Sequence, residues 1–310
     1  MRRCAVFSCL GMGDGLIALV LSNNLQLNGN DVTTFHPFLE NLQDWFPHLP
    51  IRKFPSGEKL EAALKEFDRF FIIYEKSPWM KEVLSLCEKF YPDKTIVLNP
   101  IATAKCDYVY WENGRFDGSR PFVDNLYLFC KDGLKHPIVT KSNGIVIPDA
   151  VQSRRFEKRV IFHPTSSREG KNWTPAKYLK VADQLKAQGF DPVFILTEEE
   201  RQSWALEGIE APLFANASEL SSYISESGSM IGNDSGIGHL ASCLGLPTVT
   251  ICRSFQASRF WRPAWSPGVV LTPSSWVPNL KGLRLRDKHW KKWISVERVL
   301  QSFHQLTRIS

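Results

Sequence analysis

The sequence predicts an α/β fold in which parallel β-sheets are covered by helices, arranged as two domains. Apolar segments typical of buried strands alternate with helical segments along most of the chain, which favours parallel sheets with helices on both faces. The alternation forms two series, separated by a polar segment at residues 148–159. With 310 residues, the chain is long enough for two domains of ordinary size, each with its own core.

The first series lies in the amino-terminal half. RCAVFSCL predicts a strand and the segment 16–27 an amphipathic helix. DVTTF, DRFFIIY and TIVLN are expected to form further strands, with helices at SGEKLEAALKEF and MKEVLSLCEKF. Between residues 101 and about 144 no clear pattern predicts an element.

The second series begins with the strand RVIFHP. The helix TPAKYLKVADQLKAQG follows, with Pro175 near its first turn and Gly189 at its end, and DPVFIL is the next strand. SMIG and TVTIC continue the pattern as strands joined by the helical IGHLASCL. We therefore expect two Rossmann-like domains, residues 1–152 and 153–295, and an amphipathic helix at 296–310 that packs back at the domain junction.

Composition is that of a soluble globular protein in a reducing compartment. No apolar run approaches the roughly 20 residues that span a bilayer. The seven cysteines are scattered and never form a CxxC pair, which argues against a disulfide framework and against a zinc site. We therefore expect a cytoplasmic protein without a bound metal.

Basic residues are concentrated late in the chain, whose formal net charge is +6. KGLRLRDKHWKK, residues 281–292, contains six Lys or Arg against one Asp, and Trp290 and Trp293 lie among or next to them. Such a segment is usually a solvated face, and otherwise indicates an anionic lipid surface or a polyanionic substrate. The chain has no zinc-finger spacing or RNP-like motif, so nucleic acid is not expected as a partner.

The segment 230–252, MIGNDSGIGHLASCLGLPTVTIC, predicts a strand, a polar turn, a helix and another strand. Asp234 and Ser235 are good N-cap residues, and the unpaired N–H groups around Ser235 and Gly236 would bind an anion such as a phosphate. His239 lies four residues after Ser235, on the same helix face. The alternative is structural: Asp234 or Ser235 caps a buried helix, and His239 is a hydrogen-bonded, half-buried residue.

A glycine-rich loop, CLGMGDGL, follows the first strand. Its spacing is GxGxG and not the GxGxxG of dinucleotide sites, so a nicotinamide cofactor is weakly indicated. Glycines at this point let a loop approach a ligand closely, and Asp14 would project a carboxylate toward that ligand. Equally, Asp14 caps a helix that starts at Gly15.

Two further loops follow strands of the second series. HPTSSREGKNWTP, residues 163–175, offers Ser166, Ser167 and Lys171 as hydroxyl and cationic donors for a phosphate, although it lacks the GxxxxGK[ST] spacing of an ATPase loop. A solvated loop is the alternative. LTEEERQ places Glu199 and Glu200 after DPVFIL, where a carboxylate would bind a ribose diol or favour the first turn of a helix.

These motifs together resemble glycosyltransferase family 9, the heptosyltransferases of lipopolysaccharide core synthesis. The resemblance covers residues 160–252 well and the amino-terminal half only through GDGL, residues 13–16. It implies a GT-B architecture, in which two Rossmann-like domains with parallel sheets face each other across a cleft. It also implies an inverting, metal-independent transfer of a heptose from an ADP-sugar, with that donor as substrate and no cofactor.

The resemblance also implies roles for individual residues. Asp14 matches the family's general base. The donor site is expected to contain Ser166 or Ser167, Lys171, Glu199 or Glu200, Asp234, Ser235, Gly236 and His239. On the acceptor side we expect Gly13, Gly15, Arg262 and Lys288.

The expected partners are the nucleotide-sugar donor, an anionic glycolipid acceptor of the lipopolysaccharide-core type, and the inner face of the cytoplasmic membrane as a peripheral contact. Two departures concern the acceptor half: IALVLSNNL has no proline where the family has a motif like LxxxPAL, and the chain is short for the family. The alternatives are a nucleotide-sugar epimerase of the same fold and a catalytically inactive GT-B-like binding protein.

Overall fold

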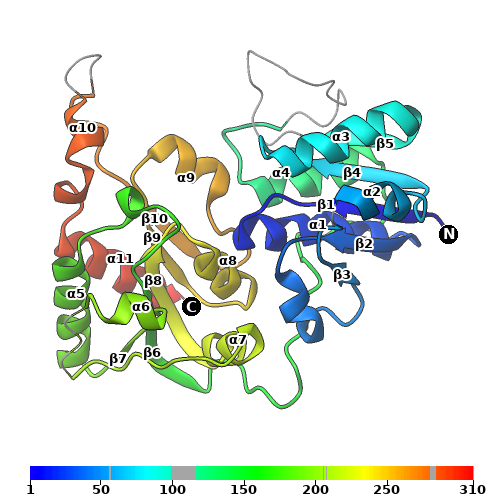
Figure 1. The fold of residues 1–310 in the computed structure, drawn as a ribbon. Helices are drawn as coiled ribbons and strands as arrows, with labels where there is room; N and C mark the ends of the chain where they lie inside the picture. Colours follow the sequence, from blue (N-terminus) through cyan, green and yellow to red (C-terminus); the bar gives the residue numbers. More distant parts are fainter. Residues whose placement is uncertain (56, 99–115, 205, 207, 280–283, 310) are drawn as a thin grey trace. The chain divides into compact units, whose positions relative to one another are not determined.

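The computed structural model contains two compact units, Met1–Val146 and Ile147–Ser310. It describes the chain except for residues 56, 99–115, 205, 207, 280–283 and 310, so residues 101–115 of the segment without a predicted element lie outside the described residues. Each unit holds a five-stranded sheet in which every strand pair is parallel. The predicted α/β class with two parallel sheets is confirmed (Figure 1).

The first unit has the strand order β3-β2-β1-β4-β5. Its strands are β1 (Arg3–Phe7), β2 (Asp31–Phe35), β3 (Ile51–Arg52), β4 (Arg69–Ile73) and β5 (Thr95–Leu98). Its helical segments are α1 (Met12–Leu27), η1 (Leu39–Trp45), α2 (Gly57–Leu64), α3 (Pro78–Phe90), η2 (Pro92–Lys94), α4 (Phe122–Leu128) and η4 (Phe129–Gly133). The direction of strand order reverses between β1 and β4, and ligands of such sheets bind beyond the carboxyl ends of the strands at this switch point.

Helix α1 begins four residues earlier than the sequence pattern indicates, so the glycine-rich loop forms its first turn. Almost every residue from Gly13 to Leu25 is buried, because the helix is apolar on most of its circumference. Near its end, Asn24 exchanges hydrogen bonds with the backbone of Thr140, and Asn28 with that of Ile138. These amides satisfy backbone groups of the irregular residues 138–140. Earlier in the segment 101–144, where the sequence predicts no element, the structure contains α4 and η4.

The second unit has the strand order β10-β9-β8-β6-β7. Its strands are β6 (Phe156–His163), β7 (Asp191–Phe194), β8 (Ser227–Asn233), β9 (Thr248–Ile251) and β10 (Gly268–Leu271). Its helical segments are η5 (Glu169–Lys171), α5 (Pro175–Ala187), α6 (Glu198–Arg201), α7 (Ala217–Ser225), α8 (Gly236–Cys243), α9 (Phe255–Trp261), α10 (Leu285–Lys288), η6 (Trp290–Lys292) and α11 (Val296–Ile309). Here the switch point lies between β6 and β8.

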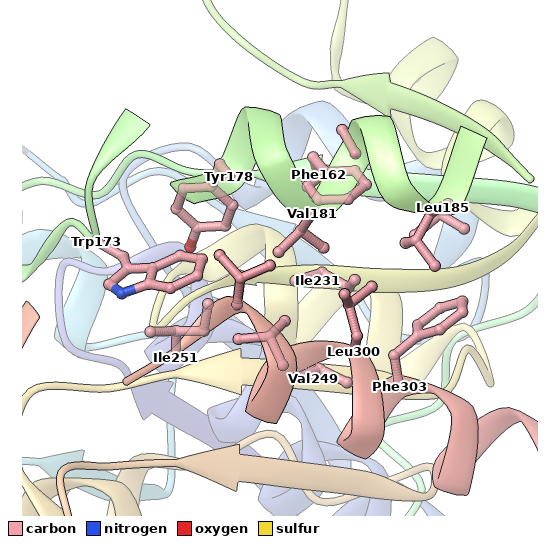
Figure 2. Close-up of a cluster of buried hydrophobic side chains, with 14 of the residues drawn as sticks. Phe162, Trp173, Tyr178, Val181, Leu185, Ile231, Val249, Ile251, Leu300 and Phe303 are labelled. Carbon is pink, nitrogen blue, oxygen red and sulfur yellow. The ribbon is translucent and has the colours of Figure 1, made fainter. Parts of the chain in front are cut away.

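A hydrophobic core joins α5 and α11 to the second sheet. Figure 2 shows Val181 and Leu185 of α5 close to Leu300 and Phe303 of α11, with Ile231 of β8 among them. The carboxyl-terminal helix, which we expected to pack at the domain junction, thus buries its apolar face in the core of the second unit. Within the described residues, no helix is both long enough and apolar enough to span a bilayer.

Candidate functional site

At the switch point of the first unit, Asp14 occupies the first turn of α1. Gly11 is the N-cap residue of α1, and as a glycine it has no side chain that could cap the helix. The carboxylate of Asp14 lies close to Gly11, as a Cβ atom built at position 11 would be only 2.4 Å from Asp14 Oδ2. Asp14 therefore lies where the helix dipole stabilises a negative charge. The alternative in which it caps a helix that starts at Gly15 is wrong, because α1 begins at Met12 and its N-cap is Gly11.

A second carboxylate, Glu75, lies at the same loop and was not predicted. Its Oε2 atom accepts a hydrogen bond from the backbone N–H of Leu10 at 3.2 Å. Its Oε1 atom is buried and has no hydrogen-bond partner among the described residues. Burial raises the pKa of the Cys9 thiol, and the charges of Asp14 and then Glu75 raise that pKa further. Two carboxylates thus face one loop at the ends of β1 and β4.

His36, also not predicted, supports this loop from the end of β2. It is fully buried, and its Nδ1 atom accepts hydrogen bonds from the backbone N–H groups of Phe38 and Leu39. The proton must therefore be on Nε2, which donates to the carbonyl oxygen of Gly11 at 3.1 Å. Burial lowers the pKa of His36 to about 4, so the ring is neutral at neutral pH.

The glycines expected on the acceptor side have a packing role in the structure. A Cβ atom at Gly15 would lie 2.4 Å from Cδ2 of His36 and 2.5 Å from a methyl group of Leu39. Gly13 is buried in the same turn of α1. The close approach that the glycine-rich loop predicts is therefore, at Gly15, an approach to a histidine ring.

At the switch point of the second unit, Asn233 ties the end of β8 to the loop after β6. This buried amide accepts hydrogen bonds from the backbone N–H of Trp173 at 3.1 Å and from the hydroxyl of Tyr178 at 2.9 Å. Its Nδ2 atom donates to the carbonyl oxygen of Pro164 and to Asn172 Oδ1. Residues 163–175, the loop that we predicted to bind phosphate (the phosphate loop), are thus held near both ends by the side chain of Asn233.

Within this loop, Lys171 and Ser166 are brought to the end of β8. The Nζ atom of Lys171 lies 3.7 Å from Asp234 Oδ2, and the lysine side chain is 44% exposed. Ser166 Oγ lies 2.7 Å from Asn172 Oδ1 and 3.1 Å from the carbonyl oxygen of Arg168, either of which can accept its proton. Ser167 is exposed. Lys171 is thus half-exposed beside a carboxylate that is only 16% exposed.

The amino-terminal end of α8 contains two buried polar atoms, Ser235 Oγ and His239 Nδ1, that have no hydrogen-bond partner among the described residues. Ser235 holds the N-cap position but makes no side-chain cap bond. The part of the structural alternative in which the Ser235 side chain caps the helix is therefore wrong. Buried polar atoms without partners are rare and cost about 1–3 kcal/mol each, which a ligand hydroxyl or oxyanion at this helix end would recover.

His239 is neutral in this environment. Burial lowers its pKa, while the charge of Asp234 and a backbone hydrogen bond with Trp261 act in the opposite direction. Because Nδ1 has no partner among the described residues, the bond to Trp261 is made through Nε2, which leaves Nδ1 as an acceptor. Gly236 begins α8 beside it.

The glutamates after β7 form the first turn of α6, as the helix alternative predicted. Glu200 completes a capping box with Thr197, whose N–H donates to Glu200 Oε2 at 2.8 Å. Its charge also reaches His163 at the end of β6, where burial lowers the histidine's pKa and Glu200 raises it. Glu199 is exposed. Of the two, Glu200 is the one directed toward the strand ends.

The remaining predicted residues, Arg262 and Lys288, are exposed and belong to the second unit, whereas Gly13 and Gly15 belong to the first. The basic segment begins outside the described residues. Trp290 within it is buried and donates to the carbonyl oxygen of Gly170, so this tryptophan fastens the phosphate loop. The described residues contain no group of three or more His, Cys, Asp or Glu placed to hold a metal ion.

Residues 148–274 match the model of the family described as glycosyltransferase family 9 (heptosyltransferase). None of the curated proteins matches the chain. The matched residues include the phosphate loop, both glutamates and the α8 turn.

Solved structures resemble the whole chain. A glycosyl transferase family 9 protein from Veillonella parvula has a TM-score of 0.71 at 19% identity, with 100% of this chain and 98% of that chain covered. The E. coli ADP-heptose lps heptosyltransferase II has a TM-score of 0.67 at 15% identity, covering 99% of each chain. The E. coli heptosyltransferase WaaC with ADP-2-deoxy-2-fluoro heptose has a TM-score of 0.66 at 12% identity, with 98% of this chain and 99% of that chain covered. At such identities the likeness shows a shared fold, and the predicted GT-B class is confirmed.

Proposed function

We propose that this chain, a heptosyltransferase-like glycosyltransferase that carries a family 9 domain, transfers a heptose or similar sugar from an ADP-sugar to an anionic glycolipid of the lipopolysaccharide-core type. The reaction proceeds with inversion and without a metal ion. The observation that carries the proposal is the group of residues at the start of α8: Lys171 Nζ beside Asp234, and the buried atoms Ser235 Oγ and His239 Nδ1 without partners among the described residues.

In this proposal, the diphosphate of the donor binds at this group of residues. As the glycosidic bond breaks, negative charge grows on the leaving ADP, and a cation and a helix N-terminus at the phosphates stabilise that charge. Lys171 supplies the cation and the N–H groups at Gly236 the helix terminus. His239 Nδ1, an acceptor, suits a hydroxyl of the sugar, and Glu200 suits the ribose diol.

Asp14 is the proposed general base. An acceptor hydroxyl must lose a proton as it attacks the anomeric carbon, and a carboxylate beside it accepts that proton. Glu75 holds the loop in front of Asp14 through the N–H of Leu10, which makes it a positioning residue. One carboxylate base is sufficient, because inversion at the anomeric carbon requires a single displacement.

The acceptor and the membrane contact concern exposed groups late in the chain. Trp276 is 91% exposed and Trp293 is 46% exposed. Lys288 and Lys292 are exposed as well. Tryptophan with lysine is the combination that binds anionic bilayer surfaces, so we place the enzyme in the cytoplasm, peripheral to the inner membrane. Flotation that does not respond to the anionic lipid content of vesicles would rule this contact out.

The test is turnover. Purified protein incubated with ADP-heptose and a lipopolysaccharide-core acceptor is expected to release ADP, with the same rate after treatment with a chelator. An active heptosyltransferase serves as the control for substrates. ADP release that requires an added metal would reject metal independence alone. Conversion of the donor sugar without acceptor would support the epimerase alternative, and donor binding without turnover the inactive binding protein.

A further inference from the structure

A pocket of about 340 Å³ opens at the amino-terminal edge of the first sheet. It is lined at the starts of β1 and β4 by Arg2, Cys4 and Arg69, and from the segment after η4 by Leu134 and His136. Asp14 and Glu75 follow the carboxyl ends of the same parallel strands. The pocket therefore lies at the opposite edge of the sheet from these carboxylates, at least the length of a five-residue strand away, or about 15 Å.

Positive charge predominates in the pocket. Burial raises the pKa of the Cys4 thiol to about 11, and Arg69 and then Arg2 are the strongest charges opposing that rise, which places both guanidinium groups near the thiol. Asp68 and Asp31 act on it more weakly. In the described part of the chain, no ion pair joins Arg2 or Arg69 to a carboxylate.

The negative charge of Asp68, which lies near the pocket, is partly neutralised by Arg3. Asp68 accepts a hydrogen bond from the backbone N–H of Arg3 at 2.8 Å, and its Oδ2 atom lies 4.0 Å from Arg3 Nε. Arg3 is not among the residues that line the pocket. The two guanidinium groups at the pocket are thus left with donors to spare.

His136 adds an independent observation. Its Nδ1 atom is buried without a hydrogen-bond partner among the described residues. Burial lowers the pKa of this histidine, and the neighbouring charge of Arg69 lowers it further. The preceding residue, Lys135, has a φ of 54°, in the left-handed region that non-glycine residues rarely adopt, and it follows the π-helical turn η4. Backbone strain of this kind is concentrated at ligand sites.

We propose that this pocket binds a doubly charged oxyanion, inorganic phosphate or a small phosphomonoester, between the guanidinium groups of Arg2 and Arg69 with His136 beside them. Two guanidinium groups match the charge of such an anion, and their planar forks match its oxygen atoms. The ligand would also give the buried Nδ1 atom of His136 a partner. None of its lining residues belongs to the proposed donor site, and the proposal stands whether or not the proposed function is correct.

The test is calorimetric titration with inorganic phosphate at constant ionic strength. The Lys171→Ala protein is the reference, because phosphate binding at α8 is then weakened. We expect phosphate to bind the reference protein. Combining Arg69→Gln or Arg2→Gln with Lys171→Ala should then weaken phosphate binding by about tenfold or more. Arg2 is exposed at the start of the chain, so its replacement leaves the fold intact even if Arg69→Gln does not.

Lys59→Gln is the control, since it removes an exposed positive charge of α2 in the same unit, outside the pocket, and should leave the phosphate affinity unchanged. Absence of phosphate binding in the reference protein would overturn the proposal, as would equal weakening by Lys59→Gln and Arg2→Gln. Glycerol 3-phosphate distinguishes the two ligand sources: affinity equal to that of phosphate points to a monoester, and much lower affinity to the inorganic ion. Either result supports the site.

Discussion

The side-chain oxygen of Asn233 accepts a hydrogen bond from the backbone N–H of Trp173 at 3.1 Å, which fixes the end of the phosphate loop to the end of β8. Through the same side chain the loop is also tied at Pro164. Lys171 lies between these two points. The position of the lysine relative to α8 therefore depends on a residue that does not need to touch the ligand.

Replacing Asn233 tests this dependence. Asn233→Ala leaves the N–H of Trp173 buried without its partner, and one such loss costs about 1–3 kcal/mol of unfolding free energy. We expect that destabilisation together with weaker ADP binding. Tyr178→Phe is the matched control, because it removes only one of the four bonds. Denaturant unfolding and calorimetry measure the two effects, and unchanged ADP affinity in a destabilised Asn233→Ala protein would limit Asn233 to a structural role.

The glycine at position 15 is explained by the ring of His36. Gly15→Ala gains about 1 kcal/mol of helix propensity but forces a Cβ atom into the ring, and overpacking of a core costs about 1–3 kcal/mol. We expect a net loss of stability. Gly118→Ala is the control, since a Cβ atom there meets no atom within 4 Å. If Gly15→Ala has a melting temperature equal to or above that of the wild type, the His36 ring moves away from the added Cβ atom at little cost.

His36 also predicts how stability depends on pH. Its folded-state pKa, about 4, is below the value of 6.5 in the unfolded chain, so its contribution is complete above pH 6.5 and is lost as the pH falls toward 4. The loss from this group is about 3 kcal/mol. Denaturant unfolding at pH 7.5 and at pH 4.5 measures it, with His36→Gln as the comparison. Equal pH dependence in the two proteins would show that His36 is not the titrating group.

The two carboxylates at the first switch point should differ in their effects on turnover. Asp14→Asn is expected to lower kcat by about 10²-fold or more while leaving ADP affinity unchanged, as removal of a general base does. Glu75→Gln keeps an acceptor for the N–H of Leu10, so its effect on kcat should be much smaller, and Glu75→Ala should be intermediate. A larger loss of kcat in Glu75→Gln than in Asp14→Asn would make Glu75 the general base and Asp14 the positioning residue.

Sequence patterns predicted the fold because both sheets are built from apolar strands that alternate with helices, and parallel sheets impose that alternation. They also predicted where charged loops lie, since strand ends such as those before Asp14 and Asp234 are followed by small polar residues. Glu75 and His36 were missed because each is a single polar residue after a strand, with no motif around it. Trp290 was assigned to a basic surface, although its indole is buried against the loop at Gly170.

Packing also distinguishes residues that are alike in the sequence. Three glutamates follow β7, and only the structure shows that Glu200 closes a capping box and acts on His163. In the same way, the sequence does not distinguish Ser166 from Ser167, whereas in the structure Ser166 bonds within the loop and Ser167 is exposed. Such choices depend on contacts between distant strand ends, which a local pattern does not contain.

Calorimetric titration with ADP tests the central claim most directly, because the claim is that Lys171 and the start of α8 hold the donor's phosphates. Lys171→Ala should weaken ADP binding by about tenfold or more, the effect of losing a charge-assisted hydrogen bond. Lys180→Ala, an exposed lysine of α5, is the control and should bind ADP like the wild type. An unchanged ADP affinity in Lys171→Ala, or no ADP binding by the wild-type protein, would contradict the account.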